Sequence, residues 1–556
     1  MLHCRLIVFG THRSVLLVIG LLLASTLAAG CGSLPPLADR TASLAARDTA
    51  DTRLGRAVSP LTRAHPQTSG IRPLRDGREA FAARALLADA AERTLDVQYY
   101  IWRADLSGTL LFESLARAAE RGVRVRLLLD DQNTAGLDAT LAALDAHPNI
   151  EVRLFNPFAH RTWRWLGYLG DFARLNRRMH NKSFTADNQA SIVGGRNIGD
   201  EYFGAGEGLL FADLDVLAVG PVVDAVSTDF DRYWASDSAY PADRLLPPSS
   251  PQDRAGPAAA ARRLRQEPAA AAYVRALAQT PLVREITAGT LEFEWAATRL
   301  VSDDPAKALG LAPPESMLFD RLRQILGPPA TELQLVSPYF VPTAAGVEAF
   351  ARLAGQGVRI SVLTNSLEAT DVAAVHAGYA KRRKPLLASG VVLYEFKRAP
   401  TPARPAQQAP ARGPLGTSAA GGAPAGSWGS SAGSASLAGS ASSASLHAKT
   451  FAVDRARLFV GSFNFDPRSA RLNTELGFVI ASPALAQALA DAFADRIPRS
   501  AYEVRLLDGE RLQWVEHRAG PGGETTAVRH PVEPGTSVWQ RLGVRVLSVL
   551  PIEWLL

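Results

Sequence analysis

The sequence predicts an α/β protein of two similar α/β/α sandwich domains, related by a pseudo-twofold axis, with an active site at their interface. Three observations predict this architecture. Apolar, strand-like runs alternate with amphipathic helical patterns, which is typical of a sheet covered by helices on both faces. The series of strands and helices occurs twice along the chain. One polar motif, with the same internal spacing, also occurs once in each copy.

The composition excludes several classes of protein. With 47% hydrophobic residues, the 556-residue chain has enough apolar material for real cores, so it is neither disordered throughout nor collagen-like. Its formal net charge of +6 is too small to require a nucleic-acid partner, although it suits an anionic surface. Two Cys residues cannot build a disulfide framework, and no cluster has zinc-finger spacing, so structural zinc is excluded.

Residues 1–30 have the features of a signal peptide. Arg5 and Arg13 precede an apolar run at 14–29, and small residues then lead to Cys31. A Cys in this position resembles a bacterial lipobox, in which Cys31 would carry the lipid and become the new N-terminus. An uncleaved signal anchor is the alternative, and both hold the protein at a membrane. We therefore predict a location in the bacterial cell envelope, with the globular part outside the cytoplasm.

The rest of the chain divides by composition. Residues 31–75 are rich in Pro, Ser, Thr, Ala and Arg without periodicity, which indicates a tether. A first domain is expected at 76–240, a Pro-rich linker at 241–280 and a second domain at 281–556. Residues 400–446 contain mainly Ala, Gly, Ser and Pro, so we expect a disordered insertion there.

Three strand-like runs of the first domain have counterparts in the second. The first run of each set is followed by a helical pattern that ends in Gly, and then by a run typical of a buried strand. The matched pairs are 95–101 with 333–340, 122–131 with 357–366, and 150–155 with 391–396.

The repeated polar motif lies at about 175–202 and again at about 442–469. In both copies a Lys follows the His by two positions, an Asp by seven and an Asn by seventeen, which chance does not readily produce twice. The members are His180, Lys182, Asp187 and Asn197 in the first copy and His447, Lys449, Asp454 and Asn464 in the second.

These residue types suit chemistry at a phosphate. Alternation along an extended segment puts the His and Lys of each copy on one face. Two such segments that meet across the domain interface would surround one cavity with two imidazoles, two ammonium groups and two amides. Cations and amides suit phosphate oxygens, and imidazoles suit a nucleophile and a general acid. Because no cluster of metal ligands appears, we expect a metal-independent site without a cofactor.

With these motifs the chain resembles the phospholipase D superfamily, whose signature is the duplicated HKD motif, and within it the bacterial cardiolipin synthases of the C type. The resemblance runs from about Gly77 to the C-terminus, although the insertion at 400–446 departs from the family pattern. It implies the phospholipase D fold. The stretches that carry it are 174–184, 194–203, 364–387, 461–477 and 550–556.

The resemblance also implies roles for the motif residues. One His forms a phosphohistidine, and the other protonates the leaving alcohol and deprotonates the incoming one. By analogy His180 is the nucleophile and His447 the acid/base, although the near symmetry of the two halves leaves this order open. The residues that hold the phosphoryl oxygens would be Lys182, Lys449, Asn197 and Asn464.

Four further features complete the prediction: two pairs of acids, an aromatic stretch and a basic run. Aligning Pro221 with Pro483 brings Asp213 opposite Glu475, and in this family such acids orient the histidines. Asp187 and Asp454 belong to the motif, and for them catalysis and a structural role both remain open. The aromatic stretch 161–172 is either core or a lip that faces lipid, and the basic run 381–384 is either a solvated helix end or a contact for anionic lipid.

The leading functional hypothesis is a phosphatidyl transferase that makes cardiolipin from two phospholipids. The alternative keeps the same site but uses water, which gives a phosphodiesterase acting on phospholipid or nucleic acid. A non-catalytic lipoprotein is a third possibility, which the intact motifs disfavour. The small net charge disfavours a nuclease, because binding a nucleic-acid backbone calls for a larger basic groove. The sequence leaves open the phosphatidyl donor, the membrane, protein partners and the oligomeric state.

Overall fold

The structure is a computed structural model that describes residues 33–205, 210–400, 443–519 and 525–556. The predicted signal peptide, Cys31 and residues 401–442 of the predicted insertion lie outside the described residues. Within the described chain, no helix is both long enough and apolar enough to cross a membrane.

The first half is a mixed sheet whose three central strands are parallel, as expected for a βαβ series. The sheet continues with antiparallel strands on one side of β2 and ends in β1. In spatial order the strands are β9 (Ala239–Pro241), β4 (Ile150–Phe155), β3 (Arg124–Asp130), β2 (Thr94–Tyr99), β5 (Ser183–Ala186), β6 (Ala190–Gly194), β8 (Asp215–Val219) and β1 (Ser69–Leu74).

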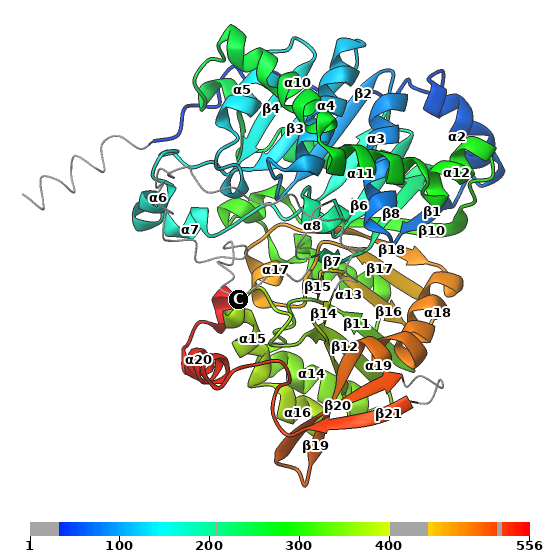
Figure 1. Cartoon of the computed structure of the whole chain (residues 1–556), viewed down its shortest axis with the longest axis vertical. Coiled ribbons are helices and arrows are strands. Elements are labelled where there is room, and N and C mark those ends of the chain that lie inside the picture. Colours follow the sequence, from blue (N-terminus) through cyan, green and yellow to red (C-terminus); the bar gives the residue numbers. More distant parts are fainter. Residues whose placement is uncertain (1–32, 206–209, 401–442, 520–524) are drawn as a thin grey trace, which may run out of the picture.

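The second half repeats this order, which confirms the predicted fold class (Figure 1). It adds one antiparallel extension beyond β13. In spatial order the strands are β21 (Thr525–His530), β20 (Arg511–Ala519), β19 (Ala501–Leu507), β13 (Val392–Phe396), β12 (Arg359–Asn365), β11 (Glu332–Val336), β16 (Thr450–Val453), β17 (Arg457–Gly461), β18 (Leu476–Ala481) and β10 (Glu294–Ser302).

Helices cover both faces of each sheet because successive strand residues point to opposite faces. Leu127 and Leu129 pack beneath α3, α4 and α5, whereas Leu128 packs beneath α9. In the second half Val362 and Leu363 likewise belong to separate clusters. The covering helices are α3 (Gly77–Ala90), α4 (Leu106–Glu120), α5 (Asp138–Asp145) and α9 (Pro221–Trp234), followed by α13 (Leu318–Leu326), α14 (Thr343–Gly355), α16 (Arg383–Ala388), α18 (Pro483–Asp491) and α19 (Ile497–Ser500).

The two halves are joined more closely than two separate sandwiches would be. Strand β1 pairs antiparallel with β10, with Gly70 opposite Trp295, so one continuous sheet runs through both halves. Further along its length β10 pairs with β18 of its own half. A side chain at Gly70 would come within 2.9 Å of Val219, so only glycine leaves room for this junction.

The predicted tether at 31–75 is wrong for much of its length. Residues 53–64 form α2 (Arg53–Ala64), and the segment before it lies on the first half, where the Ala45 N–H donates to Asp231 at 3.0 Å. Strand β1 follows, with Ile71 and Leu74 fully buried. These contacts are all with residues distant in sequence, so the segment's own composition did not indicate them.

The predicted linker at 241–280 is also corrected. It folds mainly into α10 (Pro251–Gln266) and α11 (Pro268–Ala278), followed by α12 (Pro281–Ala288), and these helices pack on the first half. Pro251, Pro268 and Pro281 stand at the first position of their helices, where the missing N–H costs nothing, whereas Pro257 lies inside α10.

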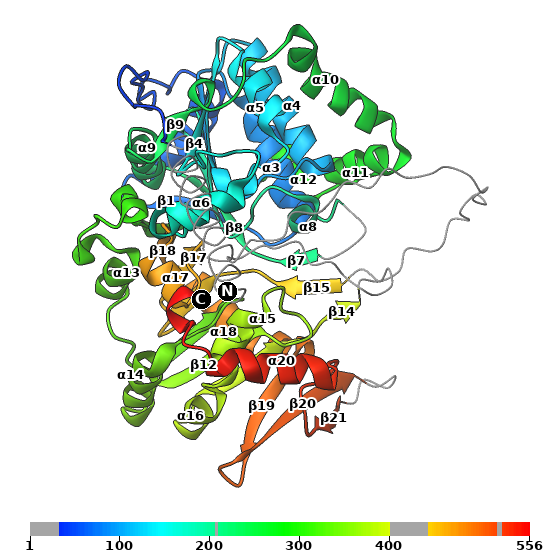
Figure 2. The ribbon, with the colours of Figure 1, turned by 90° about the vertical axis from the view of Figure 1, so that its left-hand side faces the viewer.

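The end of the predicted insertion is part of the fold. Residues 443–446 form β15 (Ser443–Leu446), which pairs with β14 (Ala399–Pro400) and in parallel with β7 (Leu210–Ala212) of the first half. Figure 2 shows these three short strands between the two halves. The pairing places the residue that follows β15, His447, at the interface.

Candidate active site

The two motifs lie at the interface of the halves, each at the entrance to a β-hairpin. His180 precedes β5 and His447 precedes β16, and their residues are only 7% and 9% exposed. Lys182 Nζ donates to the carbonyl oxygen of His180 at 2.5 Å, and Lys449 makes the same contact with His447. Each lysine is therefore folded back beside its own histidine, on the face that the spacing predicts.

Backbone pairing between the halves fixes both histidines. The His180 N–H donates to the carbonyl of Thr474 at 2.9 Å, and the His447 N–H donates to that of Ala212 at 2.8 Å. Thr474 directly precedes Glu475, and Ala212 directly precedes Asp213, so each histidine is bound next to an acidic residue of the other half. The arrangement is thus symmetric, and neither motif is completed within its own half.

The acids that the alignment paired reach across the interface. His180 Nδ1 lies 2.8 Å from Glu475 Oε2, and His447 Nδ1 lies 2.5 Å from Asp213 Oδ2. A carboxylate at Nδ1 fixes the orientation and tautomer of an imidazole and directs its chemistry to Nε2. The structure thus brings together all four residues, with each acid serving the histidine of the opposite half.

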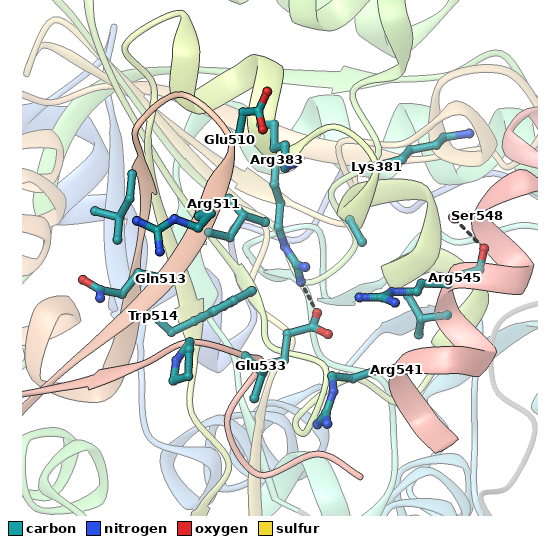
Figure 3. Close-up of a pocket in the computed structure, with 17 residues that line it drawn as sticks. Lys381, Arg383, Glu510, Arg511, Gln513, Trp514, Glu533, Arg541, Arg545 and Ser548 are labelled. Carbon is teal, nitrogen blue, oxygen red and sulfur yellow. Dashed lines mark hydrogen bonds and ion pairs between the residues drawn. The ribbon is translucent and has the colours of Figure 1, made fainter. Parts of the chain in front are cut away.

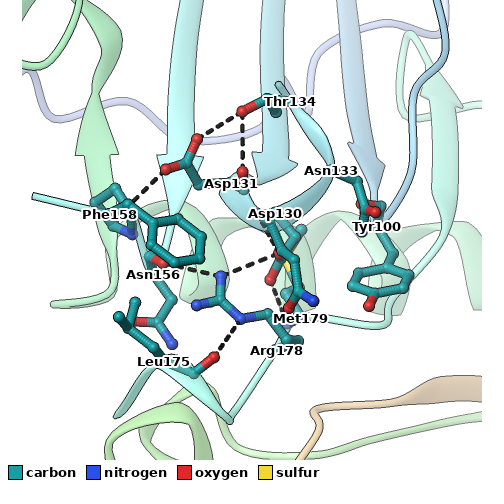
Figure 4. Close-up of polar contacts among 12 residues, drawn as sticks. Tyr100, Asp130, Asp131, Asn133, Thr134, Asn156, Phe158, Leu175, Arg178 and Met179 are labelled. Carbon is teal, nitrogen blue, oxygen red and sulfur yellow. Dashed lines mark hydrogen bonds and ion pairs between the residues drawn. The ribbon is translucent and has the colours of Figure 1, made fainter. Parts of the chain in front are cut away.

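The segment that leads to His180 is held at the carboxyl end of β3 (Figure 4). Asp130, the last residue of β3, accepts from the Met179 N–H at 2.8 Å and from Arg178 Nη1 at 3.2 Å. Arg178 also donates to the carbonyl of Asn156. Because these groups are buried and hydrogen-bonded, they fix the position of the backbone next to His180.

The sequence analysis assigned no role to several residues of the site. Tyr100 packs edge-on against His180, with ring centroids 5.0 Å apart, and Tyr202 packs against His447 at 5.2 Å. Ser462 donates to Glu475 Oε2, whereas a side chain at its counterpart, Gly195, would come within 2.1 Å of Asp213. In the sequence this difference is visible as Gly-Gly at 194–195 in the first motif and Gly-Ser at 461–462 in the second.

A buried ion pair between Asp303 and Lys307 holds the backbone of Glu475 in place. The Glu475 N–H donates to Asp303 Oδ2 at 2.9 Å, and Lys307 Nζ donates to the same oxygen at 2.9 Å. Lys307 also donates to the carbonyl of Ser469. The bond from the Glu475 N–H to Asp303 thus ties Glu475 to the segment that follows β10.

The cavity disfavours additional positive charge while no anion is bound. Burial lowers the pKa of His180 well below its usual value, and the two lysine ammonium groups lower it further. Burial and Lys449 lower the pKa of His447 to about 3. Burial also lowers the pKa of Lys449 to about 8 and that of Lys182 well below its usual value. A bound phosphodiester anion would raise these values again.

The two orienting acids differ in charge. Burial raises the pKa of Glu475 to about 7. Burial also tends to raise the pKa of Asp213, but His447 and Lys449 outweigh that effect and lower it below its usual value. Near neutral pH Asp213 is therefore a carboxylate, whereas Glu475 gains or loses its proton in this range.

The two asparagines are not equivalent. Asn197 Oδ1 accepts from the Ile101 N–H at 3.2 Å, and its amide donates to the Tyr202 hydroxyl at 3.0 Å, so this side chain organises the site. The buried Asn464 Oδ1 has no hydrogen-bond partner within the described chain. The predicted contact with phosphoryl oxygens stays a prediction for both.

The structure corrects the catalytic role predicted for Asp187 and Asp454. Both lie in the turns of the β5–β6 and β16–β17 hairpins, at the opposite end of the strand from the histidines, with φ of 50° and 53°. Asp187 accepts from the backbone N–H groups of residues 92–94, and Asp454 accepts from those of 330–332. Their carboxylates anchor the starts of β2 and β11 and take no part in the cavity.

The weaker sequence features are also placed. The stretch 161–172 forms α6 (Arg164–Gly170) and begins α7 (Phe172–Leu175), and several of its aromatic side chains are exposed. Residues 381–384 follow α15 (Ala373–Ala380) and enter α16. Among the described residues, no group of three or more His, Cys, Asp and Glu side chains is arranged to hold a metal ion.

Comparison with known proteins decides the family. A sequence model described as "Cardiolipin synthase, PLD-like domain" matches residues 85–234 and 425–497. Cardiolipin synthase C of Escherichia coli (strain K12) is 49% identical over 506 residues, which cover 91% of this chain and 100% of that protein. This chain belongs to the cardiolipin synthase family of the phospholipase D superfamily. It is a phosphatidyl transferase of that superfamily.

Other similar proteins are more distant. Cardiolipin synthase A of Cronobacter sakazakii is 26% identical over 447 residues, covering 78% of this chain and 69% of that protein. The crystal structure of the phosphatidylserine synthase of Haemophilus influenzae Rd KW20 has 14% identity and a TM-score of 0.50, with 81% of this chain and 91% of that one covered. At this identity the likeness shows the phospholipase D fold alone.

Proposed function

We propose that this protein synthesises cardiolipin, by moving a phosphatidyl group from one phospholipid to another through a phosphohistidine intermediate. The observation that carries the proposal is the pair of buried histidines, each held at Nδ1 by a carboxyl group of the other half and flanked by a lysine. The extensive identity with a protein named cardiolipin synthase C supports the choice of product.

The first step transfers the phosphatidyl group to the enzyme. Following the superfamily resemblance, Nε2 of His180 attacks phosphorus, and the bond from phosphorus to the headgroup oxygen breaks. Nε2 of His447 donates the proton that the leaving alcohol needs. Lys182 and Lys449 balance the negative charge of the phosphoryl oxygens, whose arrival raises the pKa of both histidines.

The second step transfers the group to a lipid alcohol. A hydroxyl of the acceptor phospholipid gives its proton to His447 Nε2 and attacks phosphorus, and the bond from phosphorus to His180 breaks. With water as the acceptor, the same site would release phosphatidic acid and act as a phosphodiesterase. The near-complete burial of both histidines favours the transferase, since it limits the access of bulk water.

The proposal is tested by the products formed from labelled phospholipids. We expect purified protein to form cardiolipin when it is given phosphatidylglycerol, alone or with labelled phosphatidylethanolamine, and a chelator to leave the rate unchanged. Label in the two possible donors identifies which one supplies the phosphatidyl group. Phosphatidic acid as the sole labelled product would contradict the transferase and support the hydrolytic alternative.

We further propose that a lipid on Cys31 holds the enzyme at a membrane of the bacterial cell envelope, with the globular part outside the cytoplasm. The apolar run and small residues before Cys31 support this proposal. Mass spectrometry of the mature N-terminus should find a diacylated Cys31, and Cys31→Ala should abolish the modification. An unmodified N-terminus that begins elsewhere would contradict the anchor and leave the enzyme assignment intact.

A further inference from the structure

Helix α20 (Val538–Val549) packs on the second half through one side only. Val544 is buried in a small cluster with Leu367 and Ala377, and Leu547 packs against that cluster. At about 100° per residue, the opposite side of the helix forms an apolar stripe within an arc of roughly 100°. This α20 stripe is exposed and consists of Val538, Trp539, Leu542, Val546 and Val549. Trp539 is 78% exposed and Val549 80%, so the stripe has no partner within the described chain.

Positive charge lies beside the stripe. Arg541 and Arg545 project from α20 and, with Lys384, line a cavity of about 510 Å³. Figure 3 shows Arg545 pointing from α20 into this cavity. Among the described residues, none of these three side chains forms an ion pair. The deeper Arg383 is neutralised by Glu533 at 2.7 Å, so it adds little to the outer charge.

A second apolar patch lies on the same side of the molecule. In the α6–α7 segment, Trp163 is 63% exposed, and Trp165, Leu169 and Phe172 are also exposed. Figure 1 places α6, α7 and α20 along one edge, and Figure 2, which views that edge, shows α6 and α20 facing the reader with the C-terminus between them. The two patches therefore come from different halves but face the same way.

The C-terminal tail links this side to the active site. Arg468 donates its N–H to the carbonyl of Leu556 at 2.8 Å and its Nη2 to Asn176 Oδ1 at 2.9 Å. Asn176 lies four residues before His180, and Trp554 of the tail is exposed. The exposed side thus adjoins the segment that carries one of the two histidines.

We propose that this side rests on an anionic phospholipid bilayer, with the α20 stripe and the α6–α7 aromatics in the headgroup region. An apolar helix face flanked by arginines, with tryptophans at its edge, has the chemistry of an interfacial helix, and its cations suit anionic headgroups. The proposal deepens the proposed function, because the bilayer is the source of its substrates. It does not require a lipid on Cys31.

The test reads the environment of α20 directly. In the full chain, Cys4→Ser and Cys31→Ser remove both native cysteines, and Val546→Cys carries an environment-sensitive fluorophore. The matched control is Ile286→Cys, at a residue that is 42% exposed. It belongs to α12, the helix that Figure 1 shows at the opposite edge from α20. With vesicles of phosphatidylcholine and phosphatidylglycerol, we expect a blue shift and quenching by brominated lipid at position 546 and neither at position 286.

Charge variants and an activity assay complete the design. Arg541→Gln with Arg545→Gln should weaken the response at position 546 several-fold, whereas Arg262→Gln with Arg263→Gln on α10 should not. A probe at position 546 that stays aqueous while the protein sediments with the vesicles would overturn the proposal. So would a blue shift that needs no vesicles and grows with protein concentration, which would identify a second copy as the partner. Cardiolipin formation is measured in the same samples. If cardiolipin forms while the probe at position 546 stays aqueous, the bilayer contact is wrong and the proposed function stands.

Discussion

Replacing His180 or His447 with Ala is expected to lower the rate of cardiolipin formation by roughly 10³- to 10⁶-fold. The two imidazoles perform consecutive parts of one transfer, and each is held by a carboxyl group of the opposite half. Loss of either therefore stops the same reaction, and the double variant should be hardly worse than the single ones. Turnover of labelled phospholipid by the purified variants measures this. Effects that multiply in the double variant would contradict a shared reaction.

The two variants should nevertheless fail at different steps. A donor with a good leaving group needs little help from a general acid, so the His447→Ala variant should still place a phosphatidyl group on His180. The His180→Ala variant should not become labelled. Quenching with denaturant at neutral to mildly alkaline pH, where the P–N bond of a phosphohistidine is stable, followed by mass spectrometry of the peptides identifies the labelled residue. Label on His447 in the His180→Ala variant would reverse the assigned order of the two histidines.

Changing the orienting acids is expected to have the next largest effect. Asp213→Asn and Glu475→Gln should each lower kcat by roughly 10²- to 10⁴-fold, because the histidine at the other side of the interface loses its fixed tautomer. Glu503→Gln on β19, which removes a carboxylate paired with Arg505, is the matched control and should leave kcat unchanged. Wild-type rates in the Asp213 and Glu475 variants, with the fold intact by circular dichroism, would contradict this role.

Glu475 also gives the reaction a pH dependence whose direction tests the order of the histidines. Below its pKa of about 7, a protonated Glu475 donates to Nδ1 of His180, and Nε2 then carries the remaining proton and cannot attack. Above that pKa, the carboxylate accepts from Nδ1 and leaves the lone pair on Nε2. With His180 as nucleophile, kcat/KM should therefore rise as the pH passes about 7, and Glu475→Gln should remove this rise. A fall over the same interval would indicate that the pair supplies the proton and that His447 attacks.

The sequence predicted the parts of the fold and site that depend on local pattern. Burial on both faces favours apolar runs such as the one within 122–131, and the series of strands and helices occurs twice, so the doubly repeated architecture could be predicted without any long-range contact. The spacing within each motif likewise put His180 beside Lys182 and His447 beside Lys449. The sequence also shows Gly195 and Ser462 at matching positions of the two motifs. Their roles could not be predicted, because they depend on the acid that lies next to each in the folded chain.

Only the tertiary structure decided which groups from the two halves meet. The bonds of His180 to Glu475 and of His447 to Asp213 join residues 295 and 234 positions apart, and no periodicity within either segment indicates a partner at that distance. The same reason explains the wrong tether and linker. Strand β1 exists because β8 and β10 provide its hydrogen bonds, and α10 and α11 are stable because the first half covers one side of each. A sequence pattern reports how deeply a segment is buried, whereas its partner is fixed only when the whole chain folds.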